Sequence, residues 1–384
     1  NNWSMATNTG VNLLGPGKTP KTNLMFLAFF VNTINAVHDH AALLRFSIAS
    51  AGNDHRLGAN EAPPAIISIF IGNYLTDVLN EVEKRVGNKF DEQDEAMLKL
   101  DIHKSIPELM LDNTDRNRTS PFAFTGNKFE FRAVGSSENC AGPMTVLNTI
   151  MAETLTQFKL DVDELIEKGE KKEIALMQTI QKYIVESKNI LFEGDGYSAA
   201  WEKEAAKRGL PNVKTTPLAL DAFVTKDSEH VFEKHLIYSK KELEARHEIL
   251  LENYTKKIQI EARIIGDMAS TYILPAAIKY QNVLIKNIRG LKEIGFDESN
   301  YAAQKLIAQK ISEHVNVINT CVKAMIEARK VANEITNSRE KAIAYCDNVK
   351  KYFDEIRYHV DKLELLVDDE YWELPKYREL LFLR

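Results

Sequence analysis

The chain has 384 residues, which exceeds the roughly 100–200 residues of one typical domain, so we expect two or more compact units. Hydrophobic residues make up 44% and charged residues 27% of the sequence, and these average values exclude a disordered, collagen-like or disulfide-stapled chain. The 49 Lys and Arg against 55 Asp and Glu give a net charge of −6, so no global positive field attracts nucleic acid or an anionic membrane.

Glycine and proline concentrate in the first 150 residues, where they divide the chain into short elements and long loops. Apolar periodicity predicts helices at about 22–46, 65–86 and 143–168. Alternation of apolar and polar residues predicts a strand at 127–134. Loops more often carry chemistry than buried cores do, so this half is where we expect a functional site.

From about residue 150 onward, the pattern is helical. Two apolar stripes near the end, at 307–325 and 349–367, recur at spacings of three and four residues. Two such helices, joined near 332–338, predict an antiparallel hairpin that buries one stripe against the other. Stripes of two or three heptads favour packing within the chain over a coiled coil with a partner.

Two polar clusters in the first half contain residues that could do chemistry. The segment 52–64, predicted as a loop between two apolar helices, holds Arg56, whose planar guanidinium can clamp a carboxylate or phosphate. It also holds Glu61, which could accept a proton from an amine. Composition alone equally favours an ordinary turn there, because Asn, Asp and Gly are common turn residues. The second cluster, at 115–121, has two arginines two positions apart, which suits a polyanion.

The third cluster lies on the predicted strand. Because side chains alternate along a strand, Lys128, Glu130 and Arg132 share one face, and Phe129 and Phe131 lie on the other. A carboxylate between two cations is usually part of a cross-strand salt bridge, and alternatively ligates a divalent metal beside anion-binding arginines. Spacing alone favours the salt bridge.

Together, the clusters resemble the catalytic domain of glutamine synthetases in both order and residue type. The sequence around 53–64 and the long helical tail resemble the type III members in particular, and Tyr197 to Leu220 is similar to part of the type III tail. Five motifs carry the resemblance: Asn1-Asn2-Trp3-Ser4, His40-Ala41-Ala42-Leu43-Leu44, Arg56-Leu57-…-Glu61-Ala62-Pro63, Arg116-Asn117-Arg118 and Glu130-Phe131-Arg132.

The resemblance implies an α+β fold. Residues 1–160 would form the C-terminal part of the catalytic domain, a partial antiparallel sheet with helices. Residues 161–384 would form a long all-helical C-terminal region with the antiparallel hairpin near 300–367. The chain would then be roughly the C-terminal half of a type III protein.

The implied activity is the ATP-dependent ligation of ammonia to the γ-carboxylate of L-glutamate, through a γ-glutamyl phosphate, to give L-glutamine. The implied partners are glutamate, ammonium and ATP, with Mg²⁺ or Mn²⁺ as the metal and with further copies of the chain in stacked rings. Neither nucleic acid nor a membrane is an expected partner, since the most apolar stretch, 24–37, is shorter than the ~20 residues that cross a bilayer.

The family's substrate contacts map onto four residues of this chain. Arg56 would hold glutamate, and Glu61 would bind ammonium and take its proton. Arg118 would stabilise the transferred phosphoryl group and also contact the nucleotide. Arg132 would bind glutamate or its acyl phosphate. Positioned cations around a phosphoryl group are what this chemistry requires.

Metal and nucleotide contacts are implied for three further residues. Glu130 would ligate a divalent ion through oxygen, while Ser4 and Lys128 are candidate nucleotide contacts. The chain departs from the family pattern at Ala123, where the common form has a second arginine, and at Asn2, where a nucleotide-contacting histidine is expected. The loop between Arg56 and Glu61 is also one residue shorter than in the common bacterial form.

The family's other metal ligands and its small N-terminal domain would precede residue 1, so we expect the isolated chain to be inactive. Two alternatives remain open: a related ligase that uses an organic amine, and a helical assembly protein with a decayed ligase segment. The three cysteines, Cys140, Cys321 and Cys346, show no CxxC spacing, which argues against a thiolate zinc site and favours a reducing, cytoplasmic location.

Overall fold

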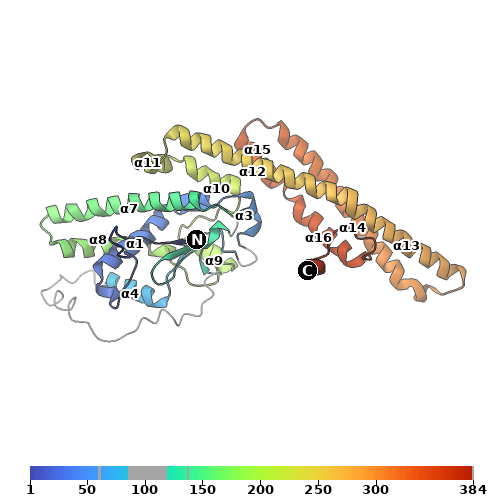
Figure 1. Ribbon diagram of the computed structural model, residues 1–384, viewed down its shortest axis with the longest axis horizontal. Helices are drawn as coiled ribbons and strands as arrows, with labels where there is room; N and C mark the ends of the chain where they lie inside the picture. The colour runs from blue at the N-terminus through green and yellow to red at the C-terminus, as the bar shows by residue number, and fades with distance from the viewer. Residues whose placement is uncertain (59–61, 85–118, 136–137, 383–384) are drawn as a thin grey trace. The chain divides into compact units, whose positions relative to one another are not determined.

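The computed structural model describes residues 1–58, 62–84, 119–135 and 138–382. The chain divides into two compact units, Asn1–His247 and Glu248–Arg384. The described part of the first unit has a small sheet with helices around it, and that of the second unit consists of helices and their connections (Figure 1). The fold is therefore mostly helical with one small sheet.

The sheet has four short strands in the order β1-β4-β3-β2. Strands β1 and β3 both run antiparallel to β4, whereas β2 runs parallel to β3, so the sheet is mixed and not purely antiparallel as expected. A parallel pair needs a crossover connection, and helix α4 lies between β2 and β3 in the chain. The strands are β1 (Asn2–Trp3), β2 (Ile69–Phe70), β3 (Phe122–Phe124) and β4 (Phe129–Phe131).

Strand β4 is the core of the strand predicted at 127–134. It is shorter than predicted because the chain enters a 3₁₀ turn at Arg132–Val134, which ends at Gly135 with a positive φ of 99°. Phe129 and Phe131 are fully buried, as the alternation predicts. The ring of Phe129 stacks on Phe30 of α1 with a centroid distance of 5.8 Å, so one face of the sheet packs against that helix.

The helices of the first unit fit the sequence predictions in part. The helix predicted at 143–168 is α7, and the helix predicted at 22–46 is two helices, α1 and α2, separated at His40 by non-helical backbone. The residues predicted as a helix at 65–86 contain β2 and then α4, because Gly72, with a φ of 81°, separates them.

The helices α1, α7 and α8 pack against one another (Figure 1). The α-helices of this unit are α1 (Leu24–Asp39), α2 (Ala41–Ser47), α3 (Ala51–Arg56), α4 (Asn73–Lys84), α7 (Ala141–Glu167), α8 (Lys172–Ser187), α9 (Ala199–Lys207), α10 (Thr216–Leu220) and α11 (Lys226–Lys234).

The segment predicted as the polar loop 52–64 begins as a helix instead. Helix α3 starts after Ser50, whose side chain accepts a hydrogen bond from the backbone N–H of Asn53, and this cap nucleates the helix. The prediction of a loop was wrong for 52–56, because a cap outweighed the turn-forming composition of the segment.

Long helices make up most of the second unit. Helix α12 (Lys240–Met268) begins before Glu248, the first residue of this unit. A π-helical segment at Ala269–Ile273 follows it and leads into α13. The remaining elements are α13 (Leu274–Glu293), α14 (Glu298–Glu334), α15 (Ser338–Ala344), a π-helical segment (Tyr345–Val349), α16 (Tyr352–Leu366) and α17 (Tyr377–Leu380).

Helices α14 and α16 pack through the two apolar stripes. Ile318 on α14 and Leu363 on α16 are both fully buried. His314, earlier on α14, lies beside His359 of α16, whereas Asn333, later on α14, bonds to Tyr345 ahead of α16, so the two helices run antiparallel. The connection is longer than a simple turn because α15 and the second π-helical segment occupy it. No helix among the described residues combines the length and the apolarity that crossing a bilayer takes.

Candidate functional site

The sheet aligns three positions of the sequence in one row. On one side, Asn2 of β1 is the direct partner of Glu130 on β4, and on the other side Ala123 of β3 is its direct partner. Directly opposite residues of antiparallel strands point to the same face. The two positions where the chain departs from the glutamine synthetase pattern are therefore the cross-strand neighbours of the proposed metal ligand.

Glu130 forms an ion pair with Arg132. The Oε2 atom of Glu130 accepts hydrogen bonds from Nη2 and Nε of Arg132, at 2.8 and 3.1 Å. The side chains are 31% and 12% exposed, respectively. The structure thus contains the salt bridge that spacing favoured, although it joins Glu130 of β4 to the 3₁₀ turn that follows and does not cross to another strand.

The third nitrogen of the Arg132 guanidinium is unsatisfied. Its Nη1 atom is buried and has no hydrogen-bond partner among the described residues. A buried donor without a partner costs on the order of 1–3 kcal/mol. An oxygen of a bound anion would satisfy this nitrogen.

Arg56 is held at the C-terminal end of α3. Its Nε donates to Oδ1 of Asn53 at 2.9 Å, and its Nη2 donates to the carbonyl oxygen of Ala133 at 2.7 Å. Burial lowers the pKa of Arg56 from its usual value, and the nearby charge of Glu138 acts in the opposite direction. Because Ala133 follows Arg132 directly, the structure brings the arginines of two distant motifs to the same turn.

Asn53 is a positioning residue that the sequence analysis did not single out. It is 3% exposed, and its Nδ2 donates to the carbonyl oxygens of Ile48 at 2.6 Å and Ala133 at 3.0 Å. Its Oδ1 accepts from Arg56. The side chain thus ties α3 to the turn after β4. In the sequence, it stood within a segment whose Asn and Asp residues all resembled turn formers, so no signal separated it from them.

Residues of the tail hold α2 and α3 in place. The hydroxyl of Thr216 lies 2.6 Å from Oδ1 of Asp54 and 2.9 Å from the carbonyl oxygen of Ser50. Nε of Arg45, a buried residue of α2, donates to the carbonyl oxygen of Val213 at 2.9 Å. The segment around 213–216 therefore braces the helix that ends in Arg56, and these contacts also escaped the sequence analysis.

The tail contacts the other end of the same segment as well. The hydroxyl of Tyr197 donates to the carbonyl oxygen of Ala62. Tyr197 stands at the start of the segment that resembled the type III tail. That segment accordingly meets both the helix before Arg56 and the chain after residue 61.

Ser4 and Lys128, the candidate nucleotide contacts, lie at neighbouring positions. The Ser4 hydroxyl is 3.1 Å from Oδ1 of Asn12 and 3.1 Å from the carbonyl oxygen of Asn127. Its single hydroxyl proton is thus used within the protein. Lys128 is half-buried and forms no ion pair with any residue that the structure describes. Lys128 is the better candidate of the two for an anionic ligand.

Glu61 and Arg118 lie outside the described residues. The structure therefore describes Arg56, Glu130, Arg132, Ser4 and Lys128, and brings Arg56 close to the Glu130–Arg132 pair. In the described ranges, no three His, Cys, Asp or Glu side chains gather as a metal-binding group. The described residues do not by themselves fit a divalent ion, because Glu130 is one ligand where such ions take several oxygens.

Comparisons with known proteins agree with the motifs. Residues 175–292 match the glutamine synthetase C-terminal domain. Over its whole length, the chain is 51% identical to a glutamine synthetase of Bacteroides fragilis (strain YCH46), covering 53% of that protein. It is also 39% identical to a type-3 glutamine synthetase of Dictyostelium discoideum and 37% identical to a glutamine synthetase of Butyrivibrio fibrisolvens, covering 52% and 53% of them.

These matches confirm the resemblance predicted from the five motifs. The chain is related along its entire length to glutamine synthetases, a type-3 protein among them. It spans about half the length of the curated relatives it matches.

Proposed function

We propose that this chain is part of a glutamine synthetase and supplies the glutamate-binding side of its active site. In the proposed reaction, the γ-carboxylate of glutamate takes the γ-phosphoryl group of ATP and ADP leaves. Ammonia then attacks the carbonyl carbon of the γ-glutamyl phosphate, the nitrogen gives up a proton, and inorganic phosphate leaves. The observation that supports this proposal is the approach of Arg56 to the turn that carries Arg132, from motifs 76 positions apart in the sequence.

Arg56 and Arg132 are proposed to bind the substrate carboxylates and the acyl phosphate. A guanidinium has five N–H donors, and the contacts of Arg56 with Asn53 and Ala133 leave several of them for a ligand. The buried Nη1 of Arg132 is a second donor for an anionic oxygen. Because both side chains are held by the protein, they need little reorganisation when charge develops on the substrate.

The remaining roles stay as the resemblance implies them. Glu61 would bind ammonium and take its proton, and Arg118 would stabilise the transferred phosphoryl group. Glu130 would be one oxygen ligand of Mg²⁺ or Mn²⁺, an ion that neutralises phosphate charge when bound. Lys128, with Ser4 nearby, would contact ATP. We derive no step through the metal, since the described residues supply one acidic ligand.

We propose that the glutamine synthetase containing this chain acts in the cytoplasm as stacked rings of identical chains.

The isolated 384-residue chain is expected to form no glutamine, because it supplies one carboxylate ligand, Glu130, to a metal that needs several. A phosphate-release assay on the purified chain with ATP, glutamate, ammonium and Mg²⁺ checks this expectation, and metal-dependent turnover would contradict it.

The test of the proposal uses a protein of the relatives' full length, in which this chain is joined to the half that it does not cover. Arg132→Gln should raise the KM for glutamate by about tenfold or more, since a hydrogen bond to a charged group contributes on the order of 1.5–3 kcal/mol. The matched control is Arg289→Gln, which removes an exposed arginine of α13. Equal glutamate KM values for the two variants would overturn the proposal.

The same protein separates the two alternatives. A related ligase would join glutamate to an organic amine in preference to ammonium, and product analysis with both amines distinguishes it. In an assembly protein with a decayed site, Glu130→Ala would disrupt oligomerisation. It would change no metal-dependent activity, because such a protein would have none. Under our proposal, Glu130→Ala abolishes metal-dependent glutamine formation.

A further inference from the structure

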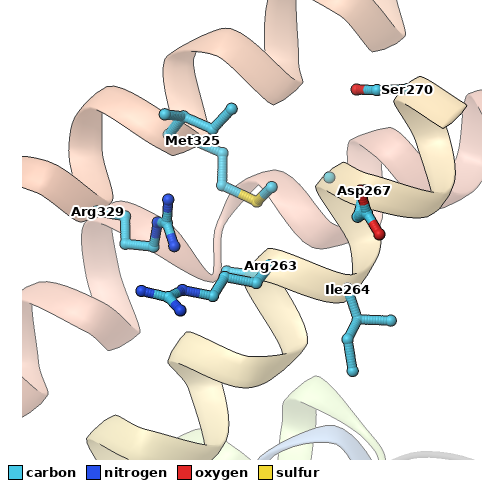
Figure 2. A pocket seen from close by; sticks show the side chains of 9 residues that line it. Arg263, Ile264, Asp267, Ser270, Met325 and Arg329 are labelled. Carbon is cyan, nitrogen blue, oxygen red and sulfur yellow. The ribbon is translucent and has the colours of Figure 1, made fainter.

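A pocket of about 480 Å³ lies in the second unit, between helices α12 and α14 (Figure 2). None of the residues in the proposed active site lies in this unit. At Gly266 on α12, a Cβ atom would meet Cε of Met325 at 3.4 Å, so glycine there lets the two helices approach closely. The labelled lining residues are Arg263, Ile264, Asp267, Ser270, Met325 and Arg329.

Two arginines meet at one end of this pocket. Arg263 projects from α12 and Arg329 from α14, and Figure 2 shows their guanidinium groups turned toward each other. Neither forms an ion pair with a described residue. Asp267 follows Arg263 by four positions on the same helix, a spacing that commonly gives an ion pair, yet the pair is not formed.

Both guanidinium groups act on a common neighbour, the hydroxyl of the buried Tyr345. Burial raises the pKa of Tyr345, while the hydrogen bond from Gln259 and the charges of Arg329 and Arg263 act in the opposite direction. Two like charges that converge without a counter-ion repel each other. An anion placed between them would remove this repulsion and would accept hydrogen bonds from both forks.

The helices that carry the arginines are fixed by other contacts. Nε2 of Gln259 donates to Oη of Tyr345 at 3.0 Å and to Oδ1 of Asn333 at 3.1 Å, and the Tyr345 hydroxyl donates to Oδ1 of Asn333 at 2.6 Å. Gln259 stands one turn before Arg263, and Asn333 one turn after Arg329. The backbones are thus positioned without the guanidinium groups, which stay available to a ligand.

We propose that this pocket binds a small organic anion, with its carboxylate or phosphate oxygens between Arg263 and Arg329. The carbon skeleton of the anion lies over Met325, and a hydroxyl or amine group of the ligand reaches Asp267 at the other end. The pocket lining carries two positive charges and one negative charge, which favours an anion with one such donor group over an uncharged ligand.

Isothermal titration of the full 384-residue chain with inorganic phosphate, and separately with succinate, tests the proposal at constant ionic strength set by chloride. We expect one of the two probes to bind this pocket. Binding of phosphate would indicate a phosphate ligand, and binding of succinate would indicate a carboxylate ligand. Arg263→Gln and Arg329→Gln should each weaken that binding by about tenfold. Arg289→Gln, the matched control on α13, should leave it unchanged.

A variant with the opposite sign separates a ligand site from a structural role. Asp267→Asn removes the negative charge of the pocket, so it should tighten binding of the same probe several-fold, an effect that loss of structure would not produce. The proposal is overturned if neither probe binds, if the two pocket arginines can be replaced without weaker binding, or if Asp267→Asn weakens it.

Discussion

Arg56 donates a hydrogen bond of 2.7 Å to the carbonyl oxygen of Ala133, the residue that directly follows Arg132. The contact joins the end of α3 to the turn after β4, across 77 positions of the sequence. Asn53 donates to the same carbonyl at 3.0 Å, so two side chains of one short helix hold this turn. The carbonyl oxygen of Ala133 therefore links the helix that ends in Arg56 to the turn that begins with Arg132.

Asn53→Ala should destabilise the protein by about 1–3 kcal/mol, because it leaves a buried carbonyl and the Arg56 Nε without their partner. Urea unfolding followed by circular dichroism measures the change. Asn253→Ala, at an exposed position of α12, is the control and should change stability by less than about 0.5 kcal/mol. Equal effects of the two substitutions would show that Asn53 does not brace the site.

Thr216→Val should cost about 1–2 kcal/mol, because it removes the hydroxyl that meets Asp54 and Ser50 while keeping the shape of the side chain. Thr215→Val is a closely matched control, since the neighbouring Thr215 makes no side-chain cap bond. The melting temperatures of the two variants give the comparison. A Thr215 variant that melts as low as the Thr216 variant would contradict the brace.

Ile318→Ala should destabilise the second unit by about 2–5 kcal/mol, because Ile318 is fully buried where α14 packs against α16 and its truncation leaves a cavity. Chemical denaturation gives the free energy of unfolding. Leu306→Ala, at a side chain that is 52% exposed on the same helix, should have little effect. A small effect at Ile318 would mean that the stripes do not form a packed core.

The second unit should lose stability in mild acid. The Nδ1 atoms of His314 and His359 lie 2.8 Å apart. Burial is the largest effect that lowers the pKa of His314, and the charge of His359 is the second. Lys362 and Lys310 act in the same direction, and Glu313 opposes them. The unfolded chain, with a histidine pKa of about 6.5, therefore binds the proton more readily. Stability is lost as the pH falls below this value through the pKa of the folded state.

Urea unfolding at pH values from about 5 to 8 measures this loss. In His314→Gln, the dependence of the unfolding free energy on pH should be flatter than in the unchanged protein. His230→Gln, at an exposed histidine, should keep the original dependence. A steeper dependence in His314→Gln would reverse the assigned sign of the pKa change.

Local patterns predicted helices and motifs well where one signal dominated. The helix α7 and the alternation of Phe129 and Phe131 follow from short-range periodicity, which a single sequence displays directly. The same reasoning failed at 52–56, where the Ser50 cap produced a helix, and at 65–86, where Gly72 separated a strand from a helix. In both places, one residue changed the backbone path of a longer segment.

The sequence by itself determined the family resemblance and the residue types of the candidate site, because motif order and chemistry are properties of the linear chain. Only the tertiary structure decided that Arg56 meets the turn after Arg132, that Asn2 and Ala123 flank Glu130, and that residues near 213–216 brace α3. Such contacts join segments far apart in the chain, and their geometry depends on how the core packs, which local periodicity does not encode.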